Sequence, residues 1–214
     1  LSQQDLSALI VALHRISQDG RPIVFIGAGL PQVARLAGEA KSYAERLFNY
    51  PVVGALDQEA AAKAIEKPII DEDASISHEA LSTIFDVTKG YPFFLQELAS
   101  FSWDNAPGPE INESDVLKSY AETISSLDNG FFRVRLDRLT KAEVGFVKAM
   151  AALGDGPYQV ADIARAMNRT QKSIGPARAS IIYKGMIYST DHGYLDFTVP
   201  LFADFIRRKH ISED

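Results

Sequence analysis

Two places in the sequence carry residue types that could contact phosphate. The first is Gly27-Ala28-Gly29, which directly follows the apolar run Ile23-Val24-Phe25-Ile26. Glycines after a buried strand let backbone N–H groups approach a pyrophosphate, as in the dinucleotide-binding turn. That fingerprint needs Gly or Ala where this chain has Gln32, and no acidic residue ends the later segment Tyr50-Pro51-Val52-Val53. The sequence therefore favours a tight strand-to-helix turn over a dinucleotide site.

The second place is the segment 171–184, which holds Lys172, Arg178 and Lys184 and no acidic residue. If this helix enters a major groove, Arg178 can approach a base edge while the two lysines meet phosphates. Basic residues near a helix C-terminus also complement the helix dipole, so a structural role is one alternative. Binding to a protein rather than to DNA is another.

Several catalytic constellations are missing from the sequence. The phosphate-cradling pattern G-x-x-x-x-G-K-S/T does not occur, and no Ser/His/Asp set or close carboxylate pair stands out. The run Asp71-Glu72-Asp73 is typical of a solvated loop. With no Cys and four widely separated His, we expect no metal site. We therefore expect this chain by itself to be unable to hydrolyse a nucleotide.

The composition is that of a chain that buries a hydrophobic core. Its 214 residues include 46% hydrophobic and 23% charged residues, with a net charge of −6. No apolar run approaches the roughly 18–20 residues of a membrane span, and no signal peptide opens the chain. We therefore expect a cytoplasmic protein without a membrane partner. Because the first residue is Leu1, we also expect a piece of a longer protein.

The first 56 residues alternate between helical and strand-like patterns. Apolar residues recur at helical spacing over residues 3–18, and a second helical stretch covers about 31–48. The short apolar segments 23–26 and 50–53 predict buried parallel strands. Two strands cannot form such a sheet, so its other strands would lie outside this chain.

The middle of the chain, residues 57–138, predicts only helices. Asp57 caps a helix that we expect to end before Pro68, and Ser77 caps a second helix that ends at Lys89-Gly90. Pro92 stands at a tolerated first-turn position of a third helix. A fourth helix begins near residue 112 and is expected to fray around residues 128–130. We expect a small helical bundle.

The last third, residues 139–214, has a different pattern. Thr140 and Glu143 form a capping box before a first helix, and a short second helix and a third helix over residues 171–184 follow. The segment 186–199 predicts a β-hairpin, and a final helix follows Pro200. Three helices followed by a two-stranded wing indicate a winged helix-turn-helix. Residues 140–214 carry 10 basic and 8 acidic side chains, whereas residues 1–139 carry 12 and 20.

The order of these parts resembles the C-terminal portion of AAA+/STAND-type P-loop ATPases, in the branch near archaeal ATPases and origin-binding initiator ATPases. The resemblance covers essentially the whole chain. Four blocks carry it: Ile23 to Gln32, Ser42 to Phe48, Gly90 to Glu97, and Lys184 to Tyr188. The first block is similar to the sensor-1 strand, the second to the arginine-bearing segment before the last core strand. The third is similar to the G-x-P turn that opens a lid helix.

The resemblance implies roles for five residues. Arg46 would be the arginine that contacts the γ-phosphate of ATP, in cis or from a neighbouring subunit. An ion pair with Glu45 or Glu39 is the alternative. Gly27 and Gln32 would lie at the nucleotide, and Gly90 and Pro92 would shape the lid turn near its base. The polar residue expected at the end of the sensor-1 strand is replaced by Gly27-Ala28-Gly29, and no lid arginine stands beside Pro92. Both departures imply weak or regulatory hydrolysis.

The expected fold is mainly α with minor β. It comprises a remnant of an α/β P-loop core (1–56), a helical lid bundle (57–138) and a C-terminal winged helix-turn-helix (139–214). ATP and Mg²⁺ would bind the intact parent protein, with no cofactor in this chain. The expected partners are the missing N-terminal P-loop region, DNA or a protein at the winged helix, and a second copy of the chain. The alternative functions are a free-standing winged-helix DNA-binding regulator and a winged-helix protein-interaction module.

Overall fold

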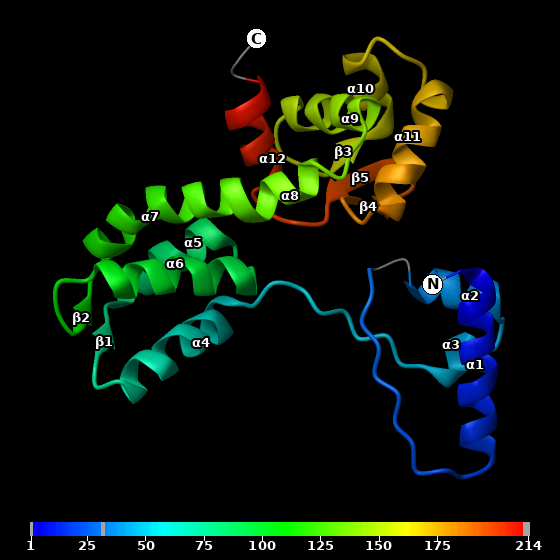
Figure 1. Cartoon of the computed structure of the whole chain (residues 1–214), viewed down its shortest axis with the longest axis horizontal. Helices are drawn as coiled ribbons and strands as arrows, with labels where there is room; N and C mark the ends of the chain where they lie inside the picture. Colours follow the sequence, from blue (N-terminus) through cyan, green and yellow to red (C-terminus); the bar gives the residue numbers. More distant parts are fainter. Residues whose placement is uncertain (1, 31–32, 212–214) are drawn as a thin grey trace. The chain divides into compact units, whose positions relative to one another are not determined.

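The chain is mainly helical with five short strands in the described residues. The computed structural model describes residues 2–30 and 33–211. The chain divides into two compact units, Leu1–Val53 and Gly54–Asp214 (Figure 1). The second unit holds both the helical bundle and the C-terminal segment, and the predicted division at residues 138/139 stays a prediction. No described helix has both the length and the apolarity of a membrane span.

The first unit contains three helices around a small core. Ser2 and Asp5 form a capping box at the start of the first helix, which confirms the predicted helix over residues 3–18. The buried side chains that join the helices are Ile10, Ala37 and Ala44. The helices are α1 (Gln3–Gln18), α2 (Val33–Ala40) and α3 (Ala44–Leu47).

The two strands predicted in this unit are absent from the structure. Residues 23–26 and 50–53 are extended but pair with no other backbone segment that the structure describes. Except for Tyr50, which packs against the small core, their side chains are largely exposed: Val24 is 84% exposed, Ile26 89%, Val52 95% and Val53 92%. A strand is stable only when a neighbour accepts and donates its ladder hydrogen bonds. The apolar pattern is thus present without the partner strands that would bury it.

The second unit begins with a bundle of four helices. Two two-residue strands, β1 (Ser75–Ile76) and β2 (Glu110–Ile111), pair in parallel at one end of the bundle. Pro68 does not end the first helix as predicted, because Ile65 and Ile69 on either side of it are both buried in the bundle core. The four helices are α4 (Gln58–Asp71), α5 (His78–Thr88), α6 (Pro92–Asn105) and α7 (Glu113–Leu127).

The helix α7 continues where the sequence predicted fraying. A π-helical segment η1 (Asp128–Phe132) follows it directly and leads into α8 (Arg133–Leu136). Asp128 is buried and accepts a 2.7 Å hydrogen bond from Arg208, and Phe132 is completely buried. These two long-range contacts hold the segment, although its Asp-Asn-Gly sequence favours a turn.

The C-terminal segment combines helices with a three-stranded antiparallel sheet of order β3-β5-β4. Thr140 and Glu143 form the predicted capping box. The short first strand of this sheet was not predicted. The elements are α9 (Lys141–Ala152), β3 (Tyr158–Gln159), α10 (Val160–Ala166), α11 (Gln171–Tyr183), β4 (Ile187–Asp191), β5 (Tyr194–Phe197), α12 (Phe202–Ile206) and η2 (Arg207–Ile211).

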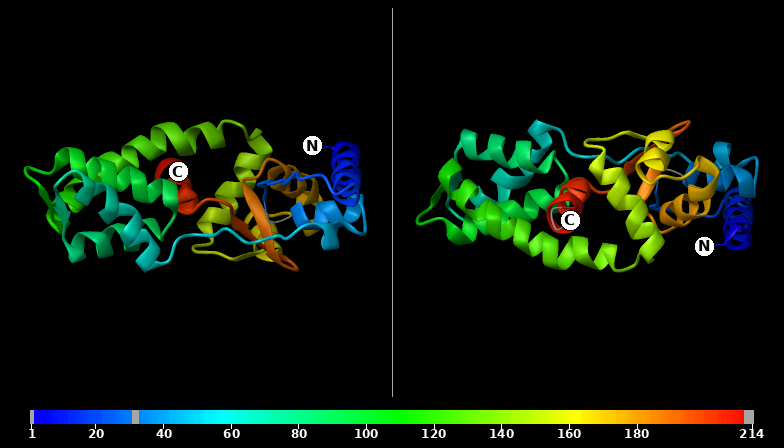
Figure 2. Two further views of the ribbon diagram at one scale, coloured as in Figure 1. Left: turned by 90° about the horizontal axis from the view of Figure 1, so that it is seen from below. Right: turned by 90° about the horizontal axis from the view of Figure 1, so that it is seen from above.

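One hydrophobic core joins the bundle to the C-terminal segment. Phe94 of α6 and Phe132 of η1 belong to the same buried cluster as Phe202 and Phe205 of α12. The views in Figures 1 and 2 place α12 beside the junction of α7 and α8, in agreement with its ring contacts to Phe132. The bundle and the C-terminal segment therefore share core side chains.

Candidate functional site

The turn between α5 and α6 has a tightly constrained backbone. Lys89 ends α5 in the left-handed conformation and Gly90 follows with φ +72°. The N–H of Leu56 donates a 2.9 Å hydrogen bond to the carbonyl of Gly90, and a Cβ at position 90 would collide with the Leu56 carbonyl oxygen. Glycine is therefore required twice, by conformation and by space. Pro92 is exposed at the first position of α6.

Aromatic rings connect this turn to the C-terminal segment. The rings of Tyr91 and Phe94 lie 4.7 Å apart, and Phe94 contacts Phe132 at 5.6 Å. Phe132 in turn stacks on Phe205 at 5.4 Å. A parallel contact runs from Phe93 to Phe131 at 4.9 Å. These rings form a continuous packed path from the turn to α12.

Arg135 lies beside the same turn, although it is 43 residues away from Pro92 in sequence. Its guanidinium carbon lies 3.7 Å from the centre of the Phe131 ring, and it donates a 3.3 Å hydrogen bond to the Phe131 carbonyl. Burial lowers the pKa of Arg135, against the opposing effect of Tyr91. Sequence reasoning missed this arginine. The four-residue spacing from Phe131 on a helix is the signal that could have indicated the stacking.

The nucleotide-related residues predicted in the first unit are described within that unit alone. Arg46 is exposed, and within the described residues it forms an ion pair with neither Glu45 nor Glu39. Glu39 pairs with Arg35 instead. Gly27 is exposed and lines a pocket of about 390 Å³ between α1 and the extended segments. Gln32 lies outside the described residues.

The three basic residues predicted on α11 differ in their surroundings. Lys172 is exposed and Arg178 half-buried, and neither side chain has a hydrogen-bond or ion-pair partner within the described part of the chain. Arg169, just before α11, is also exposed, and the helix-turn-helix position would have indicated it. Lys184 is held inside the fold: its ammonium lies 2.7 Å from the Glu143 carboxylate and donates to the Arg138 carbonyl.

The carboxylate of Glu143 is the most strongly perturbed group near α11. Burial works to raise its pKa, but hydrogen bonds from Lys184, Ser180 and the Thr140 backbone outweigh it and lower the pKa to about 2. The residue is 3% exposed. Its surroundings are those of a structural ion pair. Within the described residues, no three His, Asp or Glu side chains gather as metal ligands would.

The comparisons with known proteins cover different parts of the chain. Residues 129–206 match a family described as a domain of unknown function (DUF8462). Among solved structures, the chain is similar to a RuvB mutant of Thermotoga maritima, with 14% sequence identity and a TM-score of 0.49 over 91% of this chain and 72% of that chain. No curated protein sequence matches. A likeness this distant says nothing of ligand or activity.

Proposed function

We propose that this chain is the C-terminal part of an AAA+/STAND-like ATP-binding protein that couples nucleotide state to a DNA- or protein-binding module. The observation that carries the proposal is the aromatic connection from the Gly90–Pro92 turn through Phe94 and Phe132 to Phe205. A nucleotide held against that turn would move α6, and the shared core would move the C-terminal segment with it.

The exposed apolar segments support the sheet-remnant part of the proposal. Segments 23–26 and 50–53 combine strand-forming composition with a backbone that belongs to no described sheet and with mostly exposed side chains. Such surfaces are costly in water and point to missing neighbours. The strands of a P-loop core, encoded before residue 1, are the partners that we propose. ATP and Mg²⁺ would be held there, and Arg46 would reach the γ-phosphate in cis or from a neighbouring copy in a homo-oligomer.

The C-terminal segment is proposed to be a winged helix-turn-helix. The supporting features are the order α9, β3, α10, α11, β4, β5 and the sheet order β3-β5-β4. In this arrangement α11 is the recognition helix and the β4–β5 turn is the wing. Lys172 and Arg178 would contact the partner, whereas Lys184 would hold α11 to α9.

The first test is to determine the coding sequence upstream of Leu1. We expect G-x-x-x-x-G-K-S/T followed by an apolar strand that ends in acidic residues. The protein extended to include that region should bind a fluorescent ATP analogue in the presence of Mg²⁺. Arg46→Ala should lower its hydrolysis rate by at least about tenfold without abolishing binding, whereas Arg21→Ala, another exposed arginine of the first unit, should leave the rate unchanged. If translation begins at Leu1, the ATPase proposal fails.

A free-standing DNA-binding regulator is the second candidate, and the unpaired Lys172 and Arg178 favour it. The test is anisotropy of a labelled 20-base-pair duplex at several salt concentrations. For this candidate, Lys172→Ala should reduce the slope of log binding constant against log salt concentration by about 1, as expected for a lost phosphate contact. Lys141→Ala, an exposed lysine on α9, is the matched control. If Lys172→Ala and Lys141→Ala lose the same DNA affinity, or if the affinity hardly depends on salt, a protein partner is favoured instead.

A further inference from the structure

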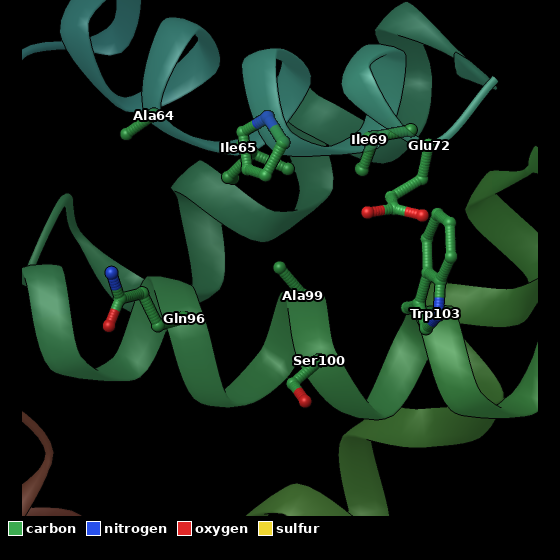
Figure 3. A pocket seen from close by; sticks show the side chains of 9 residues that line it. Ala64, Ile65, Ile69, Glu72, Gln96, Ala99, Ser100 and Trp103 are labelled. Atoms are coloured by element: carbon green, nitrogen blue, oxygen red, sulfur yellow. The ribbon is translucent and has the colours of Figure 1, made fainter. Parts of the chain in front are cut away.

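A groove runs between α4 and α6 on the surface of the bundle, and no part of the proposed function uses it. The hollow between the two helices has a volume of about 280 Å³ (Figure 3). Its walls are apolar or small: Ile65 and Pro68 come from α4, and Ala99 and Ser100 come from α6. Buried Ile65 and Leu98 hold the helices together beneath it, while the small residues leave its outer part unfilled.

One end of the groove combines a carboxylate with an indole ring. Glu72, which ends α4, and Trp103 of α6 line both this hollow and a second one of about 370 Å³ beside the loop 106–109. Figure 3 shows the two side chains at the same end of the groove. Trp103 is 41% exposed, and the carboxylate of Glu72 has no ion-pair or hydrogen-bond partner in the described ranges. Both groups are therefore available to a ligand.

The wall formed by α4 also offers a backbone acceptor. Pro68 has no N–H, so the carbonyl of Ala64 lacks the donor that an α-helix normally supplies four residues later. Ala64 and Pro68 both line the hollow. One wall of the hollow therefore includes a residue whose carbonyl lacks its usual intrahelical donor.

The bundle that carries the groove is acidic overall. Residues 57–138 carry 16 Asp and Glu against 7 Lys and Arg, and Asp71 and Asp73 flank Glu72 directly. Among the described residues, no Lys, Arg or His lines either hollow. An anionic or purely apolar partner would leave the Glu72 carboxylate unpaired at the interface, which is unfavourable.

We propose that this groove binds a basic, apolar segment of a partner protein and holds an arginine side chain between Glu72 and Trp103. The planar guanidinium can stack on the indole face and pair with a carboxylate at the same time, which a lysine ammonium does less well. Apolar side chains of the segment would fill the hollow over Ile65 and Ala99. The site lies apart from the Gly90–Pro92 turn and from α11 in sequence and in its lining residues.

The chain contains a single tryptophan, so Trp103 reports on the groove directly. The probe is a synthetic amphipathic helical peptide of Leu, Ala and Arg, titrated into the full chain while tryptophan emission is recorded. We expect a saturable change in Trp103 emission. The same peptide with Lys in place of Arg should bind more weakly, and one with Glu should not bind. Unchanged Trp103 emission with the Arg peptide overturns the proposal.

Two charge reversals separate a specific site from general attraction to an acidic surface. Glu72→Arg should weaken binding of the Arg peptide by at least about tenfold, as expected when an ion pair becomes a repulsion. Glu79→Arg makes the same change at an exposed acid on α5 outside the groove and should have little effect. Ala99→Leu, which fills the hollow, should weaken binding without changing the charge. The proposal is overturned if Glu72→Arg and Glu79→Arg weaken peptide binding equally. It is also overturned if oligoarginine binds as tightly as the amphipathic Arg peptide. Circular dichroism of each variant checks that it is folded.

Discussion

At the scale of single residues, one carboxylate joins three parts of the C-terminal segment. Glu143 caps α9 through the backbone of Thr140, accepts a 2.6 Å hydrogen bond from Ser180 of α11, and pairs with Lys184 at the end of that helix. The capping role followed from the Thr-x-x-Glu spacing. The contacts with α11 did not, because they join residues 37 and 41 positions apart, and sequence spacing carries no such information.

The lowered pKa of Glu143 predicts a specific loss of stability in acid. Because the folded pKa of about 2 lies below the ordinary value of 4.5, the ionised carboxylate stabilises the folded state. This contribution is complete above about pH 4.5 and disappears as the pH falls toward 2. Glu143→Gln should lower the free energy of unfolding at pH 7 by about 2 kcal/mol. Urea unfolding at pH 7 and pH 3 measures both effects.

The matched control for this prediction is Glu59→Gln, which breaks an exposed pair with Lys63. Exposed pairs of this kind contribute about 0.5 kcal/mol or less. The difference in stability between Glu143→Gln and the unsubstituted chain should shrink at pH 3. A difference of the same size at both pH values would show that the carboxylate charge contributes nothing.

At the scale of elements, the α5–α6 turn makes the sharpest prediction. Gly90→Ala forces a side chain into a positive φ and against the Leu56 carbonyl, so it should destabilise the chain by about 2–3 kcal/mol. Gly108→Ala, where a Cβ meets nothing within 4 Å, should change stability by less than about 0.5 kcal/mol. Thermal unfolding followed by circular dichroism compares them. If the two variants unfold at the same midpoint temperature, the turn accommodates the alanine side chain at position 90 without loss of stability.

Most helices could be predicted from local patterns, and the exceptions have long-range causes. Caps at Ser77 and Thr140 and the proline at position 92 placed helix starts correctly. Pro68 remains inside α4 because buried neighbours outweigh its cost, and η1 exists because Asp128 meets Arg208 from 80 residues away. The strands β1 and β3 are two residues long, which is too short for any alternation to appear.

The candidate site was predictable only in part. The glycine at position 90 and the basic residues of α11 could be selected from sequence. The pairing that occupies Lys184, the stacking of Arg135 on Phe131 and the groove at Trp103 could not, because each depends on which helices lie side by side. The roles assigned to Arg46, Gly27 and Gln32 remain predictions.

At the scale of the whole molecule, the uneven burial predicts where a protease cuts first. The segments 21–30 and 49–55 expose apolar side chains and belong to no helix or sheet, whereas α9 to α11 surround a packed core. Brief treatment of the full chain with thermolysin, followed by mass spectrometry, should give early cleavage within those two segments. Residues 57–211, in which the bundle and the C-terminal segment share one core, should survive longest. Early cleavage inside α9 or α11 would contradict this order of stability.

The shared aromatic core also bears on how such a chain can be rearranged by recombination. Phe132 is contributed by the end of the bundle, yet it is buried by Phe94 on one side and by Phe202 and Phe205 on the other. A crossover at residues 138/139 would leave each half with one face of an aromatic cluster exposed. The C-terminal segment can therefore be exchanged between proteins only together with the rings that it packs against. A functional exchange would therefore have to include the bundle as well as the C-terminal segment.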